Sequence, residues 1–137
     1  MSFVVKNKTL IQYQVEPGEE NIVIPKGIQK IGKRAFENHQ SIKTVFIPDG
    51  VVGIGNEAFA DCKNLVSISI PDSVQTIGSY AFCGCRALAC IRIPSAIKII
   101  NSWAFAFCSQ LSSVELPESI ETIGECAFYQ CEKLSSI

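Results

Sequence analysis

The sequence lacks an excess of charge of either sign: 12 Lys and Arg stand against 13 Asp and Glu, and the formal net charge is -1. Proteins that bind nucleic acid carry clusters of Lys and Arg that neutralise phosphates. We therefore expect no nucleic acid partner. Disorder is not expected either, since 47% of the residues are hydrophobic and only 18% are charged.

Long hydrophobic runs are missing as well. The apolar runs are a handful of residues long, whereas a membrane-spanning helix needs about 20. The N-terminus, Met1 to Lys6, has no basic flank followed by a long apolar stretch, so it does not resemble a signal peptide. We expect no membrane insertion, and the 137 residues suit one domain.

Catalytic motifs are also absent. The chain contains no phosphate-binding glycine loop, no HExxH and no GxSxG. Its single histidine, His39, lies between Asn38 and Gln40, with no nucleophile beside it to activate. The sequence therefore predicts that the protein is not an enzyme, and it indicates no cofactor and no metal.

What the sequence does contain is a repeat of 23 residues. Two independent series step by this period, and three apolar positions share it. The prolines are Pro25, Pro48, Pro71, Pro94 and Pro117, and the Ala-Phe pairs begin at Ala35, Ala58, Ala81, Ala104 and Ala127. We call each repeat a coil, and the equivalent positions of successive coils a column.

Each coil reads as a short strand, a turn and a short helix. In the third unit, Leu65 to Pro71 alternates as a strand does, and Val74 and Ile77 suit a second extended piece. The residues Ala81-Phe82-x-x-Cys85-x-x-Leu88 recur at spacings of three and four, which is typical of a helix. Stacked coils bury a continuous core. We therefore predict a right-handed solenoid with a concave parallel sheet and a stack of phenylalanine rings.

The units resemble leucine-rich repeats of the BspA-like type. Residues 71 to 91 meet the pattern Ile-Pro-x-x-Val-x-x-Ile-Gly-x-x-Ala-Phe-x-x-Cys-x-x-Leu-x-x-Ile almost in full. The resemblance covers residues 22–137, with two departures: His39 replaces the column cysteine, and Asn101 replaces the column glycine. It implies a protein-binding solenoid, and members of this family are often surface-associated and adhesive.

The two ends of the chain differ from the repeat. Residues 1–21 contain a plausible strand, Thr9 to Val15, before the turn residues Pro17 and Gly18, so we expect an N-terminal strand or hairpin cap. The last residue, Ile137, falls in the column of Val114, and no C-terminal cap is visible. An uncapped coil predicts self-association through its exposed edge, or a natural protein that continues past Ile137.

The seven cysteines fall into two groups. Four stand one above another, and we interpret them as small buried residues that fill the core; disulfides or a soft metal are the alternatives. These four, the cysteine column, are Cys62, Cys85, Cys108 and Cys131. The others, Cys83, Cys90 and Cys126, fall in polar columns, so we expect them to be partly exposed. Exposed unpaired thiols favour a reducing compartment such as the cytoplasm, whereas the resemblance favours the cell surface.

One candidate binding surface lies on the side expected to be helical. Large aromatic residues there occupy columns that other coils fill with polar residues, or lie beside such columns, and exposed aromatics are enriched at interfaces. We call this set the aromatic patch: Tyr80, Trp103, Phe107 and Tyr129. The alternative is that these side chains only cover the core.

A second candidate surface lies on the strands, where the outward positions could accept an extended polypeptide. This outer strand column comprises Phe46, Ser69, Arg92 and Glu115, with Val23 at its N-terminal end. The alternative is a plain solvated sheet face.

The sequence thus favours a non-catalytic protein-interaction module, with adhesion as the role that the resemblance adds. A structural or self-assembling repeat segment is the second hypothesis. The third, a thiol redox or metal-responsive protein, requires a lowered pKa at Cys83, Cys90 or Cys126.

Overall fold

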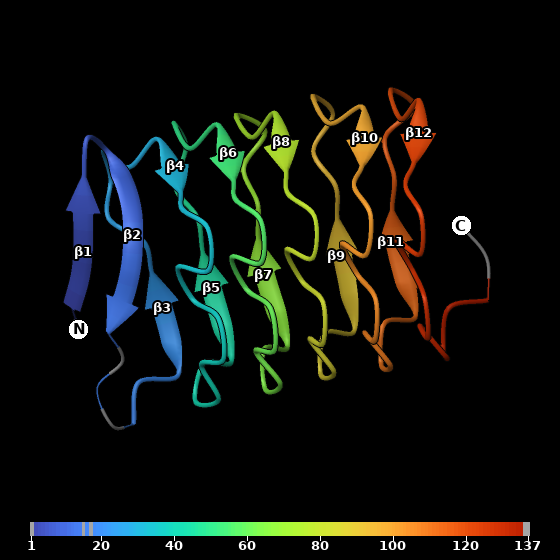
Figure 1. Ribbon diagram of the computed structural model, residues 1–137, viewed down its shortest axis with the longest axis horizontal. Helices are drawn as coiled ribbons and strands as arrows, with labels where there is room; N and C mark the ends of the chain where they lie inside the picture. Colours follow the sequence, from blue (N-terminus) through green and yellow to red (C-terminus); the bar gives the residue numbers. More distant parts are fainter. Residues whose placement is uncertain (1, 15, 17, 136–137) are drawn as a thin grey trace.

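The computed structural model describes residues 2–14, 16 and 18–135 of the chain (Figure 1). Five stacked coils follow an antiparallel hairpin formed by β1 (Ser2–Lys6) and β2 (Thr9–Gln14). β2 then pairs in parallel with the first coil, so the hairpin covers the N-terminal end of the stack, as the sequence predicted. Ile137, Val15 and Pro17 lie outside the described residues.

Two sides of each coil are extended. The first side carries three-residue strands, which end close to the column prolines because proline cannot donate to the ladder. These strands are β3 (Asn21–Val23), β5 (Thr44–Phe46), β7 (Ser67–Ser69), β9 (Cys90–Arg92) and β11 (Ser113–Glu115). The second side carries two-residue strands: β4 (Lys30–Ile31), β6 (Gly53–Ile54), β8 (Thr76–Ile77), β10 (Ile99–Ile100) and β12 (Thr122–Ile123). Neighbouring strands pair in parallel one repeat apart, for example Val45 with Ile68.

The third side, which we call the turn side, is not helical, and the predicted short helix is wrong. Two positions of each coil, four residues apart, adopt left-handed backbone angles, such as Trp103 with φ 61° and Phe107 with φ 63°. An α-helix requires φ near -63°, so a left-handed residue at every fourth position interrupts it. Alternate N–H groups instead bond the next coil: Arg34 N–H donates to Asn56 O at 3.0 Å, and Phe36 N–H to Ala58 O at 2.7 Å.

The core is the predicted stack of side chains. Phe36 and Phe59 have ring centroids 4.9 Å apart, and Phe82 and Phe105 have centroids 5.3 Å apart with an interplanar angle of 1°. Tyr13 of β2 adds a ring against Phe36 at 5.1 Å, which extends the stack into the hairpin. The cap is therefore joined to the coils through the core as well as through hydrogen bonds.

The pairing of strands between neighbouring coils is interrupted once within the described residues. β8 is not paired with β10, and β7 is not paired with β9, so the strands form separate sheets on either side of this junction. We call the junction the seam. The turn side stays closed there, since Gly84 N–H donates to Ala106 O at 2.8 Å. The solenoid thus consists of two blocks joined along the turn side.

Asn101 explains why β8 and β10 separate. Its column otherwise holds glycine, and a Cβ placed on Gly78 or Gly124 would lie 2.5 Å or 2.7 Å from a backbone nitrogen of the preceding coil. A residue with a side chain therefore cannot approach as closely. Asn101 Nδ2 donates to Ile77 O at 2.6 Å, where the backbone N–H of Gly78 bonds the equivalent carbonyl, Ile54 O. A hollow of about 150 Å³ opens beside it.

Candidate binding surfaces

The aromatic patch forms a contiguous cluster of rings on the turn side. Tyr80 and Trp103 are stacked with centroids 5.8 Å apart and an interplanar angle of 2°. Tyr129 meets Trp103 and Phe107 edge-on, at 5.5 Å in each case. Tyr80, Phe107 and Tyr129 are 41%, 40% and 45% exposed, and Trp103 is half-buried. The structure thus brings all four predicted residues together.

The patch is separate from the hydrophobic core. None of its four residues is among the described side chains that form the core or pack against it. Tyr129 lies in the column of Ala106, and its ring contacts Trp103 and Phe107 of the neighbouring coil. The four rings thus form a surface cluster beside the core.

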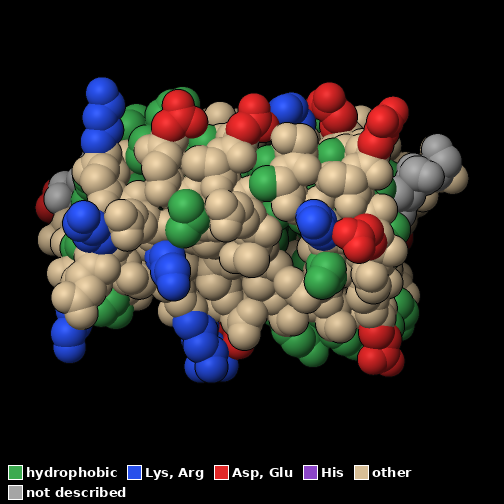
Figure 2. Space-filling model, turned by 90° about the horizontal axis from the view of Figure 1, so that it is seen from above, with side chains coloured by type: hydrophobic (Ala, Val, Ile, Leu, Met, Phe, Trp, Pro, Cys, Tyr) green, Lys and Arg blue, Asp and Glu red, His purple; other side chains and the backbone are tan. Residues whose placement is uncertain are grey.

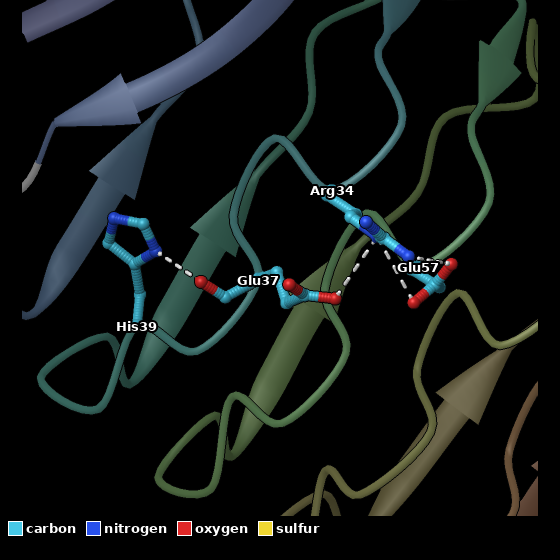
Figure 3. Close-up of polar contacts among 4 residues, drawn as sticks. All are labelled: Arg34, Glu37, His39 and Glu57. Carbon is cyan, nitrogen blue, oxygen red and sulfur yellow. Dashed lines mark hydrogen bonds and ion pairs between the residues drawn. The ribbon is translucent and has the colours of Figure 1, made fainter.

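The column that supplies Tyr80 and Trp103 shows two kinds of contact between coils. In the first two coils the column holds Arg34 and Glu57, which form an ion pair with Nε and Oε2 3.3 Å apart, and Arg34 also reaches Glu37 (Figure 3). In the third and fourth coils the same positions hold the stacked rings. This stack crosses the seam, because Tyr80 precedes it and Trp103 follows it.

The outer strand column is exposed, as predicted, but it is mixed in chemistry. Val23, 60% exposed, and Phe46, 51% exposed, lie side by side on β3 and β5, and Ser69 follows on β7. Arg92 is engaged in an ion pair with Asp72 at 3.0 Å. The apolar part of this surface is thus two side chains wide.

The cysteine column is buried and its thiols serve as donors. Each Sγ donates to the phenylalanine carbonyl of the preceding coil, at 3.0 to 3.2 Å. Burial raises the pKa of Cys62 to about 12 and raises those of Cys85, Cys108 and Cys131 as well. A raised pKa leaves little thiolate, the reactive form, at neutral pH. All seven cysteines of the chain are free of disulfides.

His39 takes the place of a column cysteine and makes the equivalent bond. Its Nε2 lies 2.8 Å from Tyr13 O, which is 26 residues away, the same separation as between Cys62 and Phe36. Its Nδ1 lies 3.0 Å from Phe36 O and 3.1 Å from Glu37 O (Figure 3). Three carbonyls therefore surround the ring, and it ties the hairpin to the first coil.

The remaining thiols lie outside the core: Cys90 is exposed, and Cys83 and Cys126 are half-buried. Burial and the carboxylates of Asp61 and Glu57 raise the pKa of Cys83, which is the opposite of what a reactive thiol needs. Among the described residues, no group of three or more His, Cys, Asp or Glu side chains is placed to hold a metal ion.

A polar hollow beside the patch was missed by sequence reasoning. Its volume is about 390 Å³, and it lies between the turns of the last three coils. The lining residues are Arg86, Phe107, Ser109, Gln130 and Glu132. The sequence does contain a feature that could have indicated this hollow: in one column the small Ser109 stands between the long side chains of Arg86 and Glu132.

A larger, shallower hollow of about 420 Å³ lies over the two-residue strands, where Gly53 leaves a gap between Lys30 and Thr76.

In the part of the chain that the structure describes, no helix is long and apolar enough to cross a membrane.

Comparisons with known proteins agree with this architecture. A family model described as "BspA type Leucine rich repeat region (6 copies)" matches residues 18–135. Among solved structures, a leucine rich cell surface protein from Faecalibacterium prausnitzii is 35% identical with a TM-score of 0.89, and the match covers 93% of this chain and 34% of that one. No curated protein matches the chain.

Two further structures have the same fold. A leucine-rich repeat protein from Eubacterium ventriosum is 28% identical with a TM-score of 0.78, over 96% of this chain and 42% of the other. A leucine-rich repeat protein from T. pallidum is 21% identical with a TM-score of 0.60, over 98% and 88%, and this likeness shows the fold alone. The chain spans about a third of the length of the Faecalibacterium protein.

Proposed function

Because the chain belongs to the BspA-type leucine-rich repeat family, we propose that it is a non-catalytic protein-interaction module that binds its partner through the aromatic patch. Leucine-rich repeat proteins are typically interaction modules, and exposed positions that vary from coil to coil carry recognition on a rigid scaffold. The observation that carries the proposal is the cluster itself: three rings 40 to 45% exposed are joined through the half-buried Trp103, outside the core.

The chemistry of the described side chains supports a non-catalytic role. The column thiols are buried donors with raised pKa values, and His39 is held among three backbone carbonyls. Neither group is placed as a nucleophile or a general base in a pocket. Adhesion is the finer proposal, and the cell surface protein from Faecalibacterium prausnitzii supports it by likeness.

Self-association is the second candidate, and the distribution of charge favours it. Residues 1–47 hold seven Lys and Arg against four Asp and Glu, whereas residues 94–137 hold two Lys and Arg against five Glu. Figure 2 shows the Lys and Arg side chains concentrated toward the N-terminal end and the Asp and Glu side chains toward the other. Opposite charges at the two ends favour head-to-tail contacts at low salt.

The test is affinity capture under reducing conditions with wild type and with the double variant Trp103→Glu, Phe107→Asn. These substitutions place in the fourth coil the residues that the same columns hold elsewhere, Glu57 and Asn38, so the variant should fold. We expect wild type to retain a partner that the variant loses. The control, Phe46→Ser, copies Ser69 into the outer strand column and should retain it.

Two outcomes would contradict the proposal. If the Phe46→Ser variant loses the partner and the double variant keeps it, the strands carry the binding. If wild type retains only further copies of itself, and light scattering shows oligomers that dissociate in salt, self-association is the function.

A further inference from the structure

The hollow beside the aromatic patch joins an apolar wall to two opposite charges. Phe107 contributes the wall, and its ring lies 6.3 Å from Trp103 by centroids, so the hollow is continuous with the patch. Arg86 and Glu132 are both exposed. Ser109 and Gln130 add a hydroxyl and an amide between them.

The two charges are not used within the protein. Among the described residues, neither Arg86 nor Glu132 has an ion-pair partner, although the exposed pairs Arg34–Glu57 and Arg92–Asp72 show that this fold forms them readily. Arg86 is in the third coil and Glu132 is in the fifth, so the coil of Ser109 separates them. A guanidinium and a carboxylate are thus displayed with a gap between them.

The spacing between the two coils favours one conformation of a bound chain. Coils on the turn side remain hydrogen-bonded across the seam, so two coils correspond to about 10 Å at roughly 4.8 Å per step. In a polyproline II segment, residues i and i+3 point the same way and lie about 9.3 Å apart. In a β-strand, residues on one face lie about 6.6 Å or 13 Å apart, so these spacings match the distance between the coils less closely.

Building on the proposed function, we propose that this hollow binds a polyproline II segment of the partner that carries an acidic and a basic residue three positions apart. The acidic side chain pairs with Arg86, whose planar guanidinium can hold a carboxylate through two hydrogen bonds. The basic side chain pairs with Glu132, and the intervening prolines pack on Phe107 and Trp103. Aromatic surfaces recognise proline-rich segments because the polyproline II helix is formed before binding.

The probe is the blocked peptide Pro-Glu-Pro-Pro-Arg-Pro, tested beside its reverse, Pro-Arg-Pro-Pro-Glu-Pro, because the chain direction is open. The spacing control, Pro-Glu-Pro-Arg-Pro-Pro, has the same composition with the charges two positions apart. Trp103 is the single tryptophan, so its fluorescence reports binding directly. We expect one of the first two peptides to bind about 3-fold to 10-fold more tightly than the spacing control, as ion pairs of this kind allow.

Substitutions test each charge. Arg86→Gln and Glu132→Gln should each weaken binding about 3-fold to 10-fold. Lys63→Gln, in the same column but outside the hollow, should not. The Arg86→Glu variant should lose binding of the original peptide. It should bind a second peptide in which arginine replaces the glutamate of the first, and a misfolded variant could not show this gain.

The proposal is overturned if all three peptides bind equally, or if Arg86→Gln and Glu132→Gln bind like wild type. It is also overturned if no peptide binds at millimolar concentration. If in any of these cases a captured partner still depends on Trp103 and Phe107, only the peptide chemistry fails and the interaction module stands. If capture also fails, the proposed function fails with it.

Discussion

Four buried thiols, one in each coil from the second to the fifth, show how a single side chain can join neighbouring coils. Each Sγ–H satisfies a phenylalanine carbonyl of the preceding coil, while its small volume fits beside the ring stack. Each of these carbonyls also accepts a backbone N–H from its own turn, as Phe59 O does from Cys62 N–H at 3.3 Å, so the thiol adds a second hydrogen bond worth about 1 kcal/mol or less. The column therefore contributes hydrogen bonding as well as packing, and only the reduced thiol supplies the hydrogen.

This arrangement predicts a loss of stability in alkali. Burial raises the pKa of Cys62 from 9.0 to about 12, so the unfolded chain loses thiol protons at a lower pH than the folded chain does. The contribution of the protonated thiol to the free energy of unfolding is fully present below about pH 9. It falls as the pH rises toward 12, by at most about 1.4 kcal/mol per pH unit for each thiol. Denaturant unfolding between about pH 8 and pH 10.5, under reducing conditions, measures the slope.

The matched control is Cys62→Ser with Cys85→Ser, which keeps a hydrogen-bond donor at each position but removes the titrating thiol. The slope should become shallower in this variant. A slope equal to that of wild type would assign the alkaline loss to other groups.

His39 provides the second prediction at this scale. Because its Nε2 bonds Tyr13 O as the column cysteines bond phenylalanine carbonyls, His39→Cys should retain most of the stability, whereas His39→Ala leaves the carbonyl without a donor. We expect His39→Ala to lower the free energy of unfolding by about 1 to 3 kcal/mol. Amide exchange in β2 should accelerate in the alanine variant. Equal exchange in both variants would show that the ring does not anchor the hairpin.

At the scale of elements, the seam shows how one side chain interrupts a repeated ladder. This column requires glycine because neighbouring coils approach closely there, and not because the chain turns. A Cβ added at these positions would lie against the backbone of the preceding coil. Asn101 satisfies one carbonyl with its side chain but leaves β8 and β10 unpaired. The turn side keeps its ladder, since Tyr80 N–H donates to Ser102 O at 3.2 Å and Phe82 N–H to Ala104 O at 2.8 Å.

Asn101→Gly should close the seam. The coils regain backbone bonds worth about 1 kcal/mol each, against an entropic cost of glycine of similar size for one residue. We expect the melting temperature to rise by about 3 °C and amide exchange in β8 and β10 to slow.

The reverse substitution, Gly55→Asn, should open a second seam between the first two coils, because a Cβ there lies 2.8 Å from Lys33 N. It should lower stability by about 2 to 4 kcal/mol. An unchanged melting temperature in Asn101→Gly, with exchange at β8 and β10 as fast as before, would mean that the seam has another cause.

At the scale of the whole molecule, the structure is two blocks with one binding surface across them. The first block runs from the hairpin to β8, and the second runs from β9 to β12. Stability in a solenoid is approximately a sum over coils and their interfaces, so a weak interface lets the blocks unfold separately. The patch has Tyr80 on one block and its other three rings on the second.

Unfolding should therefore not be two-state. Trp103 reports the second block, and we expect its fluorescence transition to occur at lower denaturant than loss of amide protection in β4 and β6, because the second block has fewer coils and no hairpin. In Asn101→Gly the two transitions should approach each other. Coincident transitions in the wild-type protein would show that the turn side and the phenylalanine stack couple the two blocks into one unit.

How far the sequence predicts the structure depends on whether a feature repeats. The 23-residue period places the strands, the phenylalanine stack and the cysteine column, because each is written in five or nearly five copies and a stacked coil must present the same side chains inward. The spacing of three and four residues on the turn side led to the wrong prediction of a short helix. Periodicity indicates which side chains face the core, but it does not indicate the sign of φ. The hollow was missed because it depends on one small residue, Ser109, in a column whose other members, Gln40, Lys63, Arg86 and Glu132, are long polar residues.

The amino-acid sequence by itself thus determined the family, the number of coils and which columns are buried, since these follow from repeated apolar positions. Asn101 was visible as an exception, and the aromatic patch as a set of exceptions. Only the tertiary structure decided that the first exception separates two blocks and that the second forms a single surface. Both outcomes depend on distances between coils: the space beside a glycine Cα, and the ring contacts that Trp103 makes with Tyr80 and Tyr129. Such distances arise only when the coils are stacked.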